Sequence, residues 1–145
     1  KRQVCDILDL ILPEGTIVST KDKNGEGETY TSDEEHKLEI PLSVLTNGNS
    51  ASASEIFAGA VQDYGVGTLV GTTTFGKGIV QQIFPLTDGT SIKLTISEYF
   101  TPKGRNIHGT GIDPDVEVEY EYNEEDPAAD NQLEKAIEIV KGNGM

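Results

Sequence analysis

Residues 40–70, IPLSVLTNGNSASASEIFAGAVQDYGVGTLV, decide the fold class of this chain of 145 residues. The first seven residues form an apolar run of strand length, and Asn47-Gly48-Asn49 then breaks that run. Small and apolar residues recur at helical spacing over about 51–64, and residues 68–70 form a second short apolar run. A strand, a helix and a strand in this order predict an α/β domain.

The patterns outside this unit predict further elements of both kinds. They are a helix over 1–12, strands over 16–21, 28–32, 79–84, 91–100 and 116–122, and a last helix whose capping box is Asn131-x-x-Glu134. Asn24-Gly25 and Asp88-Gly89 mark hairpin turns between pairs of these strands. A length of 145 residues fits one domain.

Composition excludes several classes of partner. A net charge of −14 repels nucleic acid and anionic lipid, so neither is expected to bind. The single cysteine, Cys5, rules out a disulfide within the chain. No apolar run approaches the roughly 20 residues that span a bilayer. The sequence opens on KRQVCDILDLIL without an initiator Met, so we expect it to be part of a longer chain.

Residues 71–78, GTTTFGKG, come close to the phosphate-binding pattern GxxxxGK[ST]. The last residue is Gly78 instead of Ser or Thr, and the following GIVQQIF is typical of a strand, whereas a phosphate loop leads into a helix. Nucleotide binding is therefore not predicted. We expect Gly76 and Gly78 to bend the chain around Lys77, pack closely against neighbours and leave that lysine in a desolvated position.

A second near-match concerns calcium. Asp22, Asn24, Glu26, Gly27 and Asp33 imitate the spacing of an EF-hand loop. The flanking segments are strand-like, and the final position lacks its usual Glu, so we predict no metal site here.

The segment 48–55, GNSASASE, joins a strand to a helix through a sharp turn that contains three serines. Nucleophile elbows use this topology, which presents a serine hydroxyl near main-chain N–H groups at the helix N-terminus. Ser52-x-x-Glu55 also matches a capping box, a purely structural role. The segment alone leaves both interpretations open.

A nucleophilic serine needs a base. Of the two histidines, His36 lies in a charged stretch and His108 lies in a glycine-rich loop, so His108 is the better candidate. A lysine serves instead if burial keeps it neutral, and Lys77 fits that requirement. Gln81 lies four residues on, where a continuous strand would place it on the same face, and its amide could hold the lysine without adding charge.

Three stretches, residues 47–65, 71–90 and 99–118, resemble the carboxy-terminal processing peptidases, also called tail-specific proteases. These are serine endopeptidases with a Ser–Lys dyad. The resemblance implies that Ser52 is the nucleophile, Lys77 the general base and Gln81 the residue that orients the lysine. It also implies that the N–H of Ala53 is one oxyanion donor and that Asp63 has a structural role.

The resemblance further implies a Clp-protease/crotonase-like core within the α/β class. Family members carry a PDZ domain and a strand ending in a DLRxNPGG-like motif before this region, and neither is found here. We therefore interpret residues 1–145 as the C-terminal portion of the catalytic domain, incomplete at its N-terminus. We expect this portion to have weak activity or none. We also expect it to expose a sheet edge at which two copies could pair as a homodimer.

The predicted function is cleavage of polypeptides near their C-termini, without metal or cofactor. By resemblance, the protein is expected outside the cytoplasm, in the cell envelope, the periplasm or secreted, with membrane association of the full-length protein left open. One rival is a Ser–His hydrolase that uses His108. The other is a non-catalytic portion that binds peptide or mediates assembly.

Overall fold

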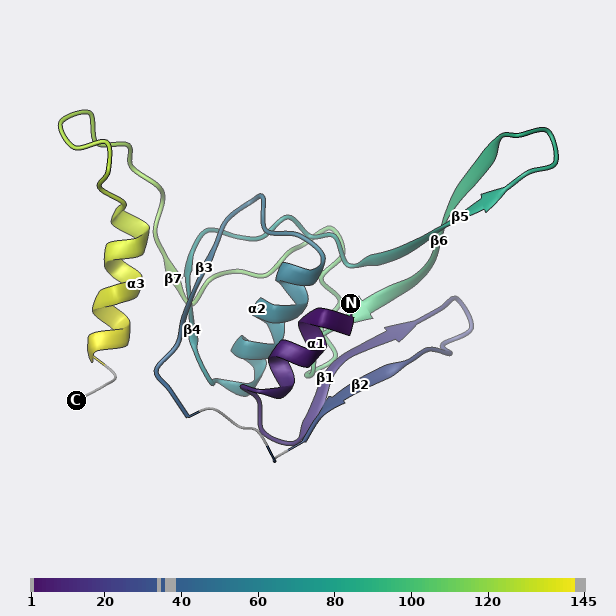
Figure 1. The fold of residues 1–145 in the computed structure, drawn as a ribbon, viewed down its shortest axis with the longest axis horizontal. Helices are drawn as coiled ribbons and strands as arrows, with labels where there is room; N and C mark the ends of the chain where they lie inside the picture. The colour runs from purple at the N-terminus through teal and green to yellow at the C-terminus, as the bar shows by residue number, and fades with distance from the viewer. Residues whose placement is uncertain (1, 34, 36–38, 143–145) are drawn as a thin grey trace.

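The computed structural model describes residues 2–33, 35 and 39–142 (Figure 1). The elements in chain order are α1 (Arg2–Asp9), β1 (Gly15–Lys21), β2 (Thr29–Ser32), β3 (Ser43–Thr46), α2 (Ala53–Tyr64), β4 (Thr68–Gly71), β5 (Ile79–Pro85), β6 (Ser91–Phe100), β7 (Val116–Glu117) and α3 (Asn131–Gly142). His36, the less favoured of the two histidines, lies outside the described residues.

The predicted strand–helix–strand unit is present as a parallel crossover. Strands β3 and β4 pair in parallel, with Val44 opposite Leu69, and α2 connects them. Strand β7 pairs in parallel with β4, which gives the order β3-β4-β7. Helix α2 buries Ile56 and Val61, and the small residues predicted to allow close packing include the fully buried Ala60. The α/β prediction is confirmed.

The second sheet is antiparallel, in the order β2-β1-β6-β5. The β5–β6 hairpin extends away from the body of the molecule, as Figure 1 shows. The segment with calcium-like spacing, residues 22–33, contains the turn between β1 and β2 and also β2 itself. Asp22 accepts the N–H groups of Asn24 at 2.8 Å and Glu26 at 2.9 Å, and these bonds lower the pKa of the Asp22 carboxyl.

The core lies where both sheets meet α1 and α2. Apolar side chains from the helices, from both sheets and from the segment after β6 fill it. The largest fully buried apolar side chains are Leu8, Leu12, Ile17, Val18, Val61, Leu69, Val70 and Ile112. Among the described helices, none is both long and apolar enough to cross a membrane.

Some predicted boundaries are wrong. Strand β3 begins at Ser43 and not at residue 40, and β7 covers two residues where seven were predicted. The cap of α3 is Asp130, whose Oδ1 accepts the N–H of Leu133 at 2.9 Å. The predicted cap, Asn131, instead donates its side-chain amide to the carbonyl of Glu119 at 2.7 Å.

Candidate active site

The turn between β3 and α2 holds Ser52 in an unusual backbone conformation. Its φ is 56° and its ψ is −108°, and it is the one non-glycine residue with positive φ among those described. Such a conformation costs about 1–3 kcal/mol and is concentrated at functional sites. A strained serine between a strand and a helix is the geometry of a nucleophile elbow.

Two neighbours of Ser52 differ in what they can do. Ala53 is exposed and is the first residue of α2, where a main-chain N–H has no acceptor within the helix. That N–H can therefore serve an oxyanion. The hydroxyl of Ser50 accepts the N–H of Asn47 at 3.1 Å, so Ser50 is part of the turn itself.

Glu55 forms one half of the predicted capping box. Its Oε2 accepts the N–H of Ser52 at 2.9 Å. Because this bond uses the main chain of Ser52, it does not occupy the hydroxyl. In the other half of the box the Ser52 side chain is an acceptor for the N–H of Glu55, which leaves the hydroxyl proton available, so the capping and nucleophile interpretations are compatible.

The loop between β4 and β5 brings Lys77 to the same place. The N–H of Lys77 donates to Oε2 of Glu55 at 2.8 Å, so Ser52 and Lys77 share one acceptor oxygen. The N–H of Phe75 also donates to the carbonyl of Ser50, at 2.9 Å. Strand β5 follows this loop, so the strand predicted after residue 78 is confirmed.

The glycines beside Lys77 have the predicted role, but the lysine does not. Gly76 has a φ of 86°, and a Cβ at Gly78 would lie 2.7 Å from the main-chain nitrogen of His108. The Lys77 side chain is nevertheless exposed, so the predicted desolvated position is wrong for the chain described. The glycines make the close contacts themselves, which leaves the intervening side chain at the surface.

Lys77 and Gln81 do not lie on one continuous strand, so the predicted common face is wrong. Strand β5 begins only at Ile79, and its register shifts between Val80 and Gln81, so simple alternation does not run from 77 to 81. The amide of Gln81 donates to Oγ1 of Thr95 on β6 at 3.4 Å. Its part in orienting the lysine stays a prediction.

His108, the alternative base, lies beside the lysine loop. Its Nδ1 is 3.3 Å from the carbonyl oxygen of Gly76, and its own N–H donates to Oδ1 of Asn106 at 2.8 Å. With Nδ1 facing a carbonyl, Nε2 is the ring nitrogen left to accept a proton. A role as base stays a prediction.

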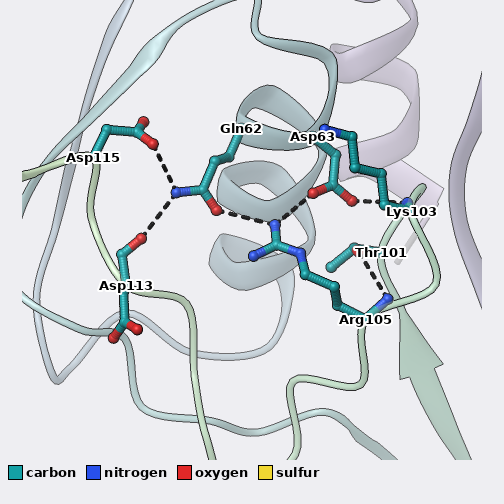
Figure 2. Close-up of polar contacts among 7 residues, drawn as sticks. All are labelled: Gln62, Asp63, Thr101, Lys103, Arg105, Asp113 and Asp115. Atoms are coloured by element: carbon teal, nitrogen blue, oxygen red, sulfur yellow. Dashed lines mark hydrogen bonds and ion pairs between the residues drawn. The ribbon is translucent and has the colours of Figure 1, made fainter.

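A polar network at the other end of α2 was not predicted from sequence (Figure 2). Asp63, whose side chain is 3% exposed, accepts Nη2 of Arg105 at 2.6 Å and the N–H of Lys103 at 2.8 Å. Arg105 also donates to Gln62 at 3.0 Å, and Gln62 donates to Asp115 at 2.9 Å. The C-terminal end of α2 is therefore fastened to the segment that follows β6.

That segment in turn supports the lysine loop from behind. The N–H of Gly109 donates to the carbonyl of Gly76 at 2.9 Å. Thr74 donates its N–H to the carbonyl of Ile112 at 3.1 Å and accepts the N–H of Ile112 on its hydroxyl at 2.8 Å. The lysine loop is thus held between α2 and residues 101–115. The structural role predicted for Asp63 agrees with this arrangement.

A hollow of about 360 Å³ lies beside the serine turn. It is lined by Val4, Val44, Leu45, Thr46, Ser50, Ala53, Ser54 and Phe57. A larger hollow, of about 550 Å³, lies between the β5–β6 hairpin and residues 21–23 and includes neither Ser52 nor Lys77. Within the described part of the chain, no group of three or more His, Cys, Asp or Glu side chains could hold a metal ion.

A strained serine between a parallel strand and a helix is an arrangement that serine hydrolases use. Residues 2–118 match the model of peptidase family S41, and the chain belongs to this family. It is 45% identical over 140 residues to a carboxyl-terminal-processing protease of Synechocystis, covering 94% of this chain and 33% of that protein. It is also 45% identical over 101 residues to the carboxy-terminal processing protease CtpB of Bacillus subtilis, covering 70% and 21% respectively.

Solved structures support the same assignment. The photosystem II D1 C-terminal processing protease superposes with a TM-score of 0.74 at 31% identity, over 96% of this chain and 35% of that one. The tricorn protease shares the fold alone. It superposes with a TM-score of 0.62 at 21% identity, over 97% of this chain and 14% of that one. The fold is thus the mixed α/β, Clp/crotonase-like fold of S41 proteases. The chain spans about a third of the length of the Synechocystis relative.

Proposed function

We propose that this chain carries the Ser52–Lys77 dyad of a serine endopeptidase that cleaves polypeptides near their C-termini. The observation that carries the proposal is the shared acceptor: the N–H groups of Ser52 and Lys77 both donate to Oε2 of Glu55. One oxygen atom therefore fixes the main chain of both residues. The names of the relatives, carboxyl-terminal processing proteases, supply the reaction class.

In the proposed reaction, the neutral amine of Lys77 removes the hydroxyl proton of Ser52 as Oγ attacks a peptide carbonyl. The tetrahedral oxyanion accepts the N–H of Ala53, at the positive end of the α2 dipole. The protonated lysine then gives its proton to the departing amine as the C–N bond breaks. Lys77 then removes a proton from water, which attacks the acyl carbon. The bond between that carbon and Oγ of Ser52 breaks, Lys77 returns the proton to Oγ, and the second product leaves as the carboxylic acid.

This reaction needs a lysine that is neutral when it acts. Lys77 is exposed in the chain described, so we propose that bound polypeptide, together with the rest of the enzyme, displaces water from its amine. The hollow beside Ala53, with Val44, Leu45 and Phe57 in its lining, offers an apolar place for a substrate side chain next to the oxyanion donor.

The test is whether the protein at its natural length hydrolyses a polypeptide substrate near the C-terminus of that substrate. We expect Ser52→Ala and Lys77→Ala each to lower kcat by more than about 1,000-fold. The matched controls are Ser91→Ala and Lys93→Ala, an exposed serine and an exposed lysine on the β5–β6 hairpin. Normal turnover without Lys77 would refute the dyad.

The same assay separates the rival functions. His108→Ala should keep most of its turnover under the dyad mechanism, although the ring contacts the lysine loop. Loss of turnover in His108→Ala with normal turnover in Lys77→Ala would establish the Ser–His alternative. Saturable peptide binding with no cleavage would favour a non-catalytic role.

A further inference from the structure

Glu55 is a fully buried carboxylate with four hydrogen-bond donors around it. Its Oε1 accepts the hydroxyl of Thr74 at 2.7 Å and the N–H of Gly76 at 2.6 Å. Its Oε2 accepts the N–H groups of Ser52 at 2.9 Å and Lys77 at 2.8 Å. Each oxygen therefore has two donors within hydrogen-bond distance.

A capping role alone does not account for this burial. A capping box needs one bond from the glutamate to the main chain and works with an exposed side chain. Taking a carboxylate out of water costs several kcal/mol unless its hydrogen bonds replace the lost hydration. Here all four donors come from neutral groups, and three of them lie on the loop that carries Lys77.

We infer that Glu55 is a positioning residue for the reaction: its carboxylate sets the spacing between the serine turn and the lysine loop. This inference rests on the proposed Ser52–Lys77 function. Oε2 joins the two main-chain segments directly, and Oε1 holds the preceding part of the loop through Gly76 and Thr74. Correct spacing matters because a displacement of about 1 Å at a reacting group lowers rates by about 100-fold.

The first test is Glu55→Gln in the protein at its natural length. Glutamine keeps the shape but replaces one oxygen with an NH₂ group, which must face two donors wherever it is placed. We expect kcat for peptide hydrolysis to fall about 10- to 100-fold, with KM changed less than about twofold, since the substrate-contacting groups remain. The matched control is Glu119→Gln, the same change at an exposed position, which should leave kcat unchanged.

A second pair of variants covers the case in which Glu55→Gln fails to fold. Thr74→Val removes one of the four donors, and with it the acceptor for the N–H of Ile112, at nearly constant volume, whereas Thr74→Ser keeps the hydroxyl for both bonds. We expect Thr74→Val to lower kcat and Thr74→Ser to restore most of it. If Thr74 acted only through packing, Thr74→Val would have the higher kcat of the two variants, because valine fills the site better than serine. Circular dichroism at the assay temperature reports the folded fraction, so that kcat refers to folded molecules.

A folded Glu55→Gln enzyme with wild-type kcat would overturn the inference, as would equal kcat values for Thr74→Val and Thr74→Ser. Ser52→Ala and Lys77→Ala are measured in the same assay. If they are inactive while Glu55→Gln is normal, the positioning role alone is wrong. If they remain active, the dyad is wrong and the positioning role is overturned with it.

Discussion

The ion pair between Asp63 and Arg105 allows a quantitative prediction. Asp63→Asn leaves one oxygen to accept the N–H of Lys103, but it turns the other acceptor into an NH₂ group that faces the guanidinium. The variant therefore loses one charged hydrogen bond and adds a contact between two donors. We expect the segment after β6 to become less firmly attached to α2.

The magnitude follows from the exposure of the two partners. A hydrogen bond to a charged group contributes about 1.5–3 kcal/mol when it is well buried. The Asp63 side chain is buried, but the Arg105 side chain is 43% exposed, so water screens the pair and lowers its contribution to the bottom of that range or below it. We expect Asp63→Asn to lower the free energy of unfolding by about 1–2 kcal/mol.

Two measurements test this value. Urea unfolding gives the change in stability, and hydrogen exchange of the Lys103 amide, which donates to Asp63, reports the local attachment. Protection of that amide should fall about tenfold for each 1.4 kcal/mol lost. Arg105→Met, which keeps the aliphatic stem, and the double variant complete a mutant cycle.

The cycle decides whether the pair acts as a unit. We expect the double variant to be more stable than the sum of the single changes predicts, with a coupling of about 0.5–1.5 kcal/mol. Additivity within about 0.3 kcal/mol, together with unchanged protection of the Lys103 amide, would refute the reasoning and leave the network without energetic importance.

Three further outcomes are expected. Gly78→Ala should lower the free energy of unfolding in urea by about 1–3 kcal/mol, because its Cβ would lie 2.7 Å from the main-chain nitrogen of His108. Gly48→Ala, with open space around the position, should leave that free energy nearly unchanged, and equal effects of the two variants would contradict this account. Burial first, and a neighbouring carboxylate second, raise the pKa of Tyr64 above its ordinary 10.0, so folding stability should fall as the pH rises above about 10. Tyr64→Phe should show a smaller fall between about pH 8 and pH 11, and identical melting curves over that range would contradict the shift. Asp130→Ala removes the cap of α3 and should speed amide exchange in the first turn of that helix, corresponding to about 1 kcal/mol.

Local patterns were sufficient for most elements of the fold. The parallel β3–α2–β4 unit and the hairpin turn at Asn24-Gly25 were predicted because their signals lie within a few residues. The start of β3 was placed too early, since Pro41 lacks the N–H that a paired strand needs. Asn131 was chosen over Asp130 because both residue types cap helices, and only the fold shows that Asn131 is engaged with Glu119.

The site was predictable in its residue types but not in its environment. The motif sequences indicate Ser52 and Lys77, yet the exposure of the lysine depends on which neighbours the glycines contact. Glu55 was interpreted only as a cap because its contacts with Thr74, Gly76 and Lys77 join segments about 20 residues apart. No periodicity in the sequence reports such contacts, so the charge at the centre of the site became visible only in the fold.

The backbone conformation of Ser52 has a consequence for how this sequence can change. Glycine would adopt a φ of 56° without strain, so Ser52→Gly should relieve part of the 1–3 kcal/mol that the turn stores, about a tenth or more of the stability of an ordinary domain. Random substitution filtered for stability alone would therefore favour glycine at this position. The serine at this position therefore keeps the strained turn together with a hydroxyl that glycine would lack.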